Sequence, residues 1–336
     1  MGITPLVIGA FDLGATLLAS LGWDVTSLGT SNSHQDMNGN GSTNTALIEG
    51  GPHVATPGFD ATTARHVAFY YYAAQASTLY VRLYKLGSVQ ARVDIAFASG
   101  ASYIYRGDGS SSLATATFTN VGGHYIEIEA NCDDSGRIRV WLDRAADSAP
   151  FLDTGAAVDT QQQATSGFDQ VSWYATGNNS RLADVLVLTS TDGRIAHEAF
   201  CIVTRPTGDG TTCDLTPSSG ADNYAMVDET SPSTADYNET TVSGDLDRYT
   251  YGALPYTPQN VLCISPVVYV ARDGTITQAR TTIDSGGTTD DGTYQAVGSA
   301  GSYRAIIESY PSNPDTSTDW TETTVNAVEA GPQFSS

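Results

Sequence analysis

Cationic residues are scarce in this chain. Of its 336 residues, 15 are Lys or Arg and 37 are Asp or Glu, so the formal net charge is −22, and Lys85 is the only lysine. A protein that binds nucleic acid needs clustered cations to neutralise phosphates, so the composition argues against a nucleic-acid partner. The same charge repels anionic membrane surfaces.

Long apolar runs and closely spaced cysteines are also missing. The sequence has no uninterrupted apolar run of about 18 residues, so we expect no membrane insertion. Asp12 interrupts the apolar N-terminal stretch and no basic residue precedes it, which makes this stretch a poor secretory signal. We therefore expect synthesis in the cytoplasm and delivery to the outside by another route. The cysteines form no CxxC pair, and buried thiols are favoured over disulfides, which stay open as an alternative: Cys132, Cys201, Cys213 and Cys263.

Sequence motifs of catalysis are absent. The five histidines are scattered along the chain, and His197 with Cys201 is the one His/Cys pair at a spacing of three or four residues. One such pair falls short of the ligand set of a metal site, so a metal or catalytic role has little support. No P-loop, dinucleotide fingerprint or Gly-x-Ser-x-Gly elbow occurs. The sequence predicts no catalytic residues, and we expect the protein not to be an enzyme.

Strand and turn residues are abundant. Only 15% of the residues are charged and 40% are hydrophobic, while Gly, Ser and Thr are frequent, as in turn-rich β proteins. Apolar and polar residues alternate in 79–84, 89–97, 124–132 and 137–143, which predicts strands with one buried face. Asp133-Asp134-Ser135-Gly136 predicts a hairpin turn. Short strands at this spacing predict a sandwich or barrel.

A cluster of turn formers at residues 205–223 predicts a domain boundary. We place an N-terminal domain at 1–205 and a smaller β-rich domain at 206–336. Strands of the second domain are expected in four segments: 249–254, 261–271, 276–283 and 303–310. Pro266 lies inside one of them, so that strand should be an edge strand or carry a bulge.

One helix is predicted near the end of the chain. Thr321 has the character of an N-cap, and Trp320 before it can pack against Val325. Gly331-Pro332 is expected to end the helix.

The strands of the first domain occur in a familiar order. His124–Cys132 reads HYIEIEANC, and Arg137–Asp143 reads RIRVWLD. Gln170–Trp173 reads QVSW, and Ala183–Leu188 reads ADVLVL. This order resembles the concanavalin A-like, laminin-G-type jelly roll over residues 11–200. The resemblance implies an all-β protein with an N-terminal β-sandwich that binds glycans or, less often, cleaves them.

The second domain contains sequence segments that resemble those of virion proteins of tailed bacteriophages. They are Cys213–Glu229, Ser285–Thr288 and Asn326–Gly331, and one departure is that Cys213-Asp-Leu stands where a Trp is expected. The resemblance implies a structural protein at the virion surface, with a tail or fibre-like adhesin first, a capsid decoration protein second and a glycan depolymerase last. The partners it implies are other virion proteins, further copies of the chain in a homo-oligomer, and host surface glycans.

Three residues are candidates for glycan binding. Glu127 and Glu129 are two apart on a strand, so both should point to one face, as a pair of hydrolytic carboxylates would; two glutamates on a solvated face are the ordinary explanation. Within Tyr70-Tyr71-Tyr72 at least one ring should be exposed and available to a sugar, with Tyr71 as the candidate. Trp141 and Trp173 are expected in the core.

Calcium is the one cofactor with any support. Asp133, Asp134 and Asp184 offer carboxylate oxygens of the kind that Ca²⁺ prefers. The alternative is an ordinary turn at Asp133-Asp134, because Asp and Gly supply the backbone angles that a hairpin needs.

Overall fold

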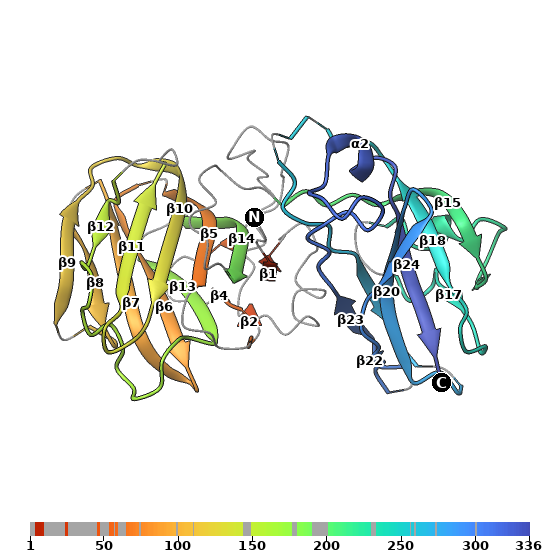
Figure 1. Ribbon diagram of the computed structural model, residues 1–336, viewed down its shortest axis with the longest axis horizontal. Coiled ribbons are helices and arrows are strands. Elements are labelled where there is room, and N and C mark those ends of the chain that lie inside the picture. The colour runs from red at the N-terminus through yellow and green to blue at the C-terminus, as the bar shows by residue number, and fades with distance from the viewer. Residues whose placement is uncertain are drawn as a thin grey trace. The chain divides into compact units, whose positions relative to one another are not determined.

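The regular secondary structure of the described residues is almost all β-strand, as predicted (Figure 1). The computed structural model describes residues 4–9, 24–25, 46–47, 54–56, 58–59, 65–73, 75–98, 100–109, 111–143, 149–176, 180–189, 201–229, 233–255, 257–258, 260–272, 274–299 and 301–336. The chain divides into two compact units, Met1–Ile202 and Val203–Ser336, next to the expected boundary. Within the described part of the chain, no helix combines the length and apolar character that a membrane crossing needs.

The first unit contains two antiparallel seven-stranded sheets, which we call sheets A and B. The central order of sheet A is β1-β14-β5-β10-β11-β12, with β3 paired to β14. Its strands are β1 (Thr4–Gly9), β3 (Ala46–Leu47), β5 (Arg65–Ala73), β10 (Gly122–Asn131), β11 (Arg137–Leu142), β12 (Leu152–Asp153) and β14 (Ser180–Thr189).

Sheet B has the order β2-β4-β13-β6-β7-β8-β9. Its strands are β2 (Asp24–Val25), β4 (Val54–Ala55), β6 (Ser77–Lys85), β7 (Ser88–Phe97), β8 (Ala101–Arg106), β9 (Ser112–Thr117) and β13 (Gln170–Thr176). The strands expected from alternation in the first domain thus all form, and the two sheets make the predicted sandwich.

The core of the first unit lies between the two sheets. Strand periodicity sends alternate side chains inward, and sheet A contributes Phe69 and Tyr71 while sheet B contributes Leu79 and Trp173. Phe69 and Trp173 pack edge to face, with ring centroids 5.7 Å apart. Trp173 is therefore a core residue, as expected.

Trp141 is not on the core face, which corrects our prediction. It follows Val140 and precedes Leu142, both of which belong to the core, so alternation places Trp141 on the opposite face of sheet A. It is nevertheless only 3% exposed, and the Arg139 guanidinium lies 5.2 Å from its ring centroid. The outward face of this sheet is therefore buried too at Trp141.

The second unit contains a six-stranded sheet of order β15-β18-β24-β20-β21, with β22 paired to β20, and two two-stranded sheets, β16-β17 and β19-β23. The strands are β15 (Pro206–Cys213), β16 (Thr216–Pro217), β17 (Asn238–Glu239), β18 (Asp247–Tyr251), β19 (Val267–Val270), β20 (Gln278–Ser285), β21 (Thr288–Asp291), β22 (Gln295–Ala296), β23 (Arg304–Ile307) and β24 (Glu329–Ser335). Pro266 directly precedes β19, so the strand starts where a backbone donor is available again.

A buried polar network holds the loop after β15 against β18. Asp247 is fully buried, and its Oδ2 accepts hydrogen bonds from Asn223 Nδ2 at 2.8 Å and from Tyr249 Oη at 2.9 Å. Asn223 Nδ2 also donates to the Leu215 carbonyl at 2.8 Å. Burial, together with the negative charge of Asp247, raises the pKa of Tyr249. Leu215 and Asn223, which belong to the Cys213–Glu229 segment, therefore stabilise the fold of the second unit.

The predicted C-terminal helix is shorter than expected. Thr321 is its N-cap, but α2 covers only Glu322–Val325 and β24 follows. Gly331-Pro332 lies inside this strand, so our placement of the helix end was wrong. A side chain at Gly331 would meet the Asp247 carbonyl oxygen at 2.1 Å, so glycine serves the close approach of two strands rather than a helix terminus.

Candidate functional site

The outward face of sheet B carries tyrosines and arginines. On β6 the core residues Leu79, Val81 and Leu83 alternate with half-buried residues. Tyr80 and Arg82 are therefore on the opposite face, away from the core.

Cross-strand register continues this face over four neighbouring strands, β13, β6, β7 and β8 (Figure 1). One row across the strands runs Tyr174, Tyr80, Asp94 and Tyr103. The next row runs Ser172, Arg82, Arg92 and Tyr105. Because both rows are on one face, side chains far apart in sequence become neighbours.

Planar groups stack across these rows. The rings of Tyr174 and Tyr80 are stacked with centroids 4.9 Å apart. The guanidinium of Arg92 lies 5.6 Å from the Tyr80 centroid and 4.6 Å from that of Tyr105, and Tyr103 and Tyr105 are 5.4 Å apart. We call these five residues the tyrosine–arginine ladder.

Carboxylates fix the arginine of the ladder. Arg92 Nε and Nη2 donate to the two oxygens of Asp94 at 2.7 and 2.9 Å, a bidentate geometry that sets the plane of the guanidinium. Asp108, in the β8–β9 turn, accepts from Arg82 Nε at 3.0 Å and from Arg92 Nη1 at 3.3 Å. The ladder is therefore preorganised by ion pairs.

Burial of Asp94 has an electrostatic consequence. Desolvation raises the pKa of the Asp94 carboxyl group above its ordinary value, and hydrogen bonds from Arg92 act in the opposite direction. The pKa of Tyr80 is also raised, first by desolvation and then by the charge of Asp94. The phenol hydroxyl of Tyr80 thus remains protonated and able to donate a hydrogen bond well above neutral pH.

The arrangement suits recognition of a polar, ring-shaped ligand. The stacked rings use much of their flat surface on one another, which leaves phenol hydroxyls and the outer ring surfaces at the ends of the ladder as contact groups. Amphipathic tyrosines combine an apolar body with a hydrogen-bonding tip. The two carboxylates beside the ladder, Asp94 and Asp108, are both paired with arginines, so neither is a free carboxylate of the kind that glycoside hydrolysis uses in pairs.

Tyr71, one of the predicted glycan-binding residues, is in the core. It is fully buried, and its hydroxyl group is hydrogen-bonded with Ser77 Oγ at 3.1 Å and Ser180 Oγ at 3.0 Å. The prediction that Tyr71 contacts a ligand is wrong, because the period of β5 turns it inward together with Phe69. Tyr72 is the half-exposed ring of the tyrosine run.

Glu127 and Glu129 do share one face of β10, as predicted, but it is not an open solvated face. Glu127 is opposite Trp141 and fully buried, so its proposed contact with a glycan is wrong. The Glu129 side chain is 26% exposed and forms an ion pair with Arg139. A ligand contact by Glu129 stays a prediction.

The three aspartates proposed for calcium do not gather into one site. Asp184 is 3% exposed in β14, where its Oδ1 accepts a hydrogen bond from the Cys201 amide at 3.0 Å. Asp133 accepts from Ser166 Oγ at 2.7 Å, which lowers the pKa of the Asp133 carboxyl group. The described residues contain no cluster of three metal-binding side chains, so the grouping is wrong.

The hairpin interpretation of Asp133-Asp134 is confirmed. The Gly136 amide donates to the Asp133 carbonyl at 3.2 Å, and β10 pairs with β11 on either side. The Asp134 carboxylate accepts from Gln161 Nε2 at 2.5 Å. Calcium binding by this turn alone stays a prediction.

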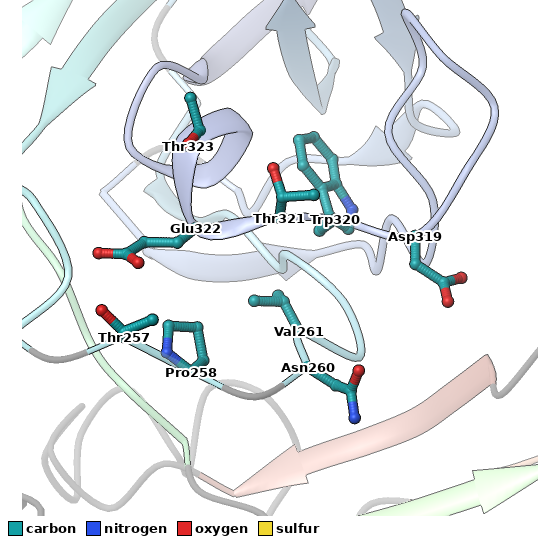
Figure 2. A pocket seen from close by; sticks show the side chains of 9 residues that line it. All are labelled: Thr257, Pro258, Asn260, Val261, Asp319, Trp320, Thr321, Glu322 and Thr323. Carbon is teal, nitrogen blue, oxygen red and sulfur yellow. The ribbon is translucent and has the colours of Figure 1, made fainter.

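A pocket in the second unit is a weaker candidate. It has a volume of about 420 Å³ and lies between residues 257–261 and 319–323 (Figure 2). Trp320 forms part of its wall, but its indole nitrogen donates to the Tyr310 carbonyl at 2.9 Å. Figure 2 shows Asp319 and Glu322 at opposite ends of the pocket, so its charged groups do not converge on one point.

Comparison with known proteins gives matches among solved structures only. No family model and no curated protein matches the chain. The CBM2 module of the evolved Dit of Lactobacillus casei BL23 phage J-1 is 14% identical, with 41% of this chain and 69% of that chain covered and a TM-score of 0.30. A tetrameric galectin from the ball sponge Cinachyrella sp. is 8% identical, with 41% and 100% covered and a TM-score of 0.32. A sialidase is 12% identical, with 57% and 19% covered and a TM-score of 0.35.

Sequence reasoning missed the ladder, although a signal for it exists. The segment Leu79-Tyr-Val-Arg-Leu-Tyr84 alternates aliphatic residues with tyrosine and arginine. In a strand with one buried face, the second set must point outward. The outward residues of 89–97 and 102–105 repeat the pattern with Arg92, Asp94, Tyr103 and Tyr105, but their alignment into a ladder depends on cross-strand register.

Proposed function

We propose that the first unit is a glycan-binding domain and that the tyrosine–arginine ladder is its binding face. The observation that carries the proposal is a stacked group of four tyrosines and one arginine on the partly exposed face of a sheet whose other face packs into the core. Sugars present both apolar C–H surfaces and hydroxyl groups, and tyrosine edges and hydroxyls match both.

Preorganisation favours binding at this face. Asp94 and Asp108 already hold Arg92 in place, so a ligand need not order the guanidinium when it binds. One such face would give modest affinity, and several copies in one assembly would add to it through multivalency.

The test is a glycan array followed by calorimetry with the purified chain. Tyr80→Ala and Tyr174→Ala each remove one ladder ring, and we expect affinity for the bound glycan to fall about tenfold, or roughly 1.4 kcal/mol. Tyr72→Ala and Tyr237→Ala are matched controls, because both residues are at least partly exposed and neither is in the ladder. Loss of binding in the controls but not in the ladder variants would refute the assignment.

We further propose that the chain is a non-enzymatic structural protein of a tailed-phage virion, at the tail or fibre first and as capsid decoration second. This proposal is supported by the resemblance of three segments to virion proteins of tailed phages: Cys213–Glu229, Ser285–Thr288 and Asn326–Gly331. Its partners would be other virion proteins and copies of itself. Mass spectrometry of intact particles and tail-less heads tests it, since a tail protein should be stoichiometric in the first and missing from the second.

A glycan depolymerase is the alternative. The burial of Glu127 and the engagement of Asp94 with Arg92 weigh against it, because hydrolysis needs two accessible carboxylates at a defined separation. Release of reducing ends from a bound polysaccharide by the purified chain would favour the depolymerase over the adhesin.

A further inference from the structure

Two arginines on the binding face are placed directly opposite each other. Arg82 of β6 pairs in register with Arg92 of β7, and like charges in this position repel each other. Their side chains are 20% and 15% exposed. An anion between them relieves the repulsion, and in the free protein that anion is the Asp108 carboxylate.

Asp108 enters this position from a turn built to approach the arginines. Gly107 and Gly109 flank it with φ angles of 63° and 108°, in the region that favours glycine. A side chain at Gly109 would meet the Arg92 guanidinium at 2.5 Å. The base of the turn is fixed by the Gly107 amide, which donates to the Gln90 carbonyl at 2.8 Å.

The Asp108 carboxylate is the loosely held part of this arrangement. Its side chain is 60% exposed, and exposed ion pairs are weak and exchange readily. Its backbone carbonyl separately accepts from Arg92 Nη1 at 2.6 Å. Rotation of the Asp108 side chain would therefore free the two-arginine position while the turn and Arg92 stay in place.

We propose that the face prefers carboxylate-bearing glycans, such as those containing uronic or sialic acids, and that Asp108 is an internal competitor for the ligand carboxylate. The ligand carboxylate takes the place of Asp108 between Arg82 and Arg92, while the sugar ring contacts Tyr80 and Tyr105. The inference rests on the proposed glycan-binding function. It deepens it by naming the ligand class and the residue that tunes affinity.

The protein's overall charge opposes such a ligand at long range. At physiological ionic strength, however, charges separated by more than about 8 Å are largely screened. Local contacts with the two arginines then decide the outcome, so binding should be measured in about 0.15 M salt.

The direct test uses NMR of the arginine Nε–H groups of Arg82 and Arg92 in the full chain, with glucuronate as the probe. We expect glucuronate to shift both signals. Asp108→Asn, which removes the charge and keeps the shape, should raise the affinity about threefold, the size expected for loss of the exposed ion pairs of Asp108 with Arg82 and Arg92. Asp159→Asn is the matched control, because Asp159 pairs with Arg106 and not with either arginine of the site; it should leave the affinity unchanged.

Further measurements separate this inference from the proposed function. Adding Arg82→Gln to Asp108→Asn should abolish the gain. If neutral glycans bind in a Tyr80-dependent manner but Asp108→Asn leaves the affinity for sialylated and uronate glycans unchanged, the inference fails and the proposed function stands. A different outcome is that no glycan binds, but glucuronate still shifts both arginine signals and does so with higher affinity in Asp108→Asn. In that case the anion site stands and the proposed function fails. Equal shifts with sulfate would overturn the carboxylate assignment.

Discussion

The outward faces of the two sheets in the first unit carry different groups: sheet A has the buried Glu127 and Trp141, and sheet B has the tyrosine–arginine ladder. On sheet A, Glu127 and Trp141 are 0% and 3% exposed, so this sheet is buried on both sides at these two residues, while Glu129 and Arg139 on the same face are 26% and 30% exposed. On sheet B, the ladder residues are partly exposed, with Arg92 at 15%, and Asp108 beside them is 60% exposed. Both faces have the same alternating pattern in sequence. Alternation therefore predicts which residues share a face, and the burial of each residue decides whether it can contact a ligand.

The largest expected effect separates the two faces of one strand, β13. Trp173→Ala should lower the free energy of unfolding by about 3–5 kcal/mol, because it leaves a cavity in the core. Tyr174→Ala, one residue along, should cost less than half as much, since its ring is half-exposed. Chemical denaturation measures both, and similar losses would break the distinction between core face and ladder face.

A middle-sized effect is expected on β10. Glu127→Ala removes a fully buried polar group and should cost about 1–3 kcal/mol, because the groups around it lose a partner. Glu129→Ala removes a partly exposed ion pair with Arg139 and should cost less than about 1 kcal/mol. Equal costs in denaturant titrations would mean that the outward face of sheet A is open at Glu127.

The smallest expected effect is a difference between Asp153 and Asp94 in how their contributions to stability depend on pH. Hydrogen bonding from Arg137 lowers the pKa of Asp153 in sheet A below its ordinary value of 3.8, so its contribution to stability is present above that value and is lost as pH falls through the folded pKa. Burial raises the pKa of Asp94 in sheet B, so its contribution is present below 3.8 and is lost as pH rises through its folded pKa.

Carboxyl-carbon NMR titration measures both groups in one sample. We expect Asp94 to titrate at higher pH than Asp153. In denaturation experiments, the stability difference between wild type and Asp153→Asn should shrink as pH falls well below 3.8. The reverse order of the two titrations would show that the ion pairs of Asp94 outweigh its burial.

Much of the fold follows from local pattern. The hairpin at Asp133–Gly136 and the strands around it form as predicted, because alternation and turn chemistry act over a few residues. The N-cap at Thr321 is also predicted correctly. The length of α2 is predicted wrongly, because Gly331 allows close strand packing against Asp247. Local sequence patterns do not predict such a contact.

The candidate site was harder to predict than the fold. Tyr71, Glu127 and Asp184 are polar residues in strands, and nothing in the sequence distinguishes a buried hydrogen-bonded polar group from an exposed one. The ladder has the opposite difficulty, because Tyr80, Arg92 and Tyr105 are on three different strands and become neighbours only through register.

The sequence by itself determined the all-β class, most strands of the sandwich and the acidic charge, because composition and period-two alternation are local properties. Only the tertiary structure decided which outward face is open and which residues form a ladder on it. The physical reason is that strand pairing brings together side chains distant in sequence, and burial depends on everything else that packs against them.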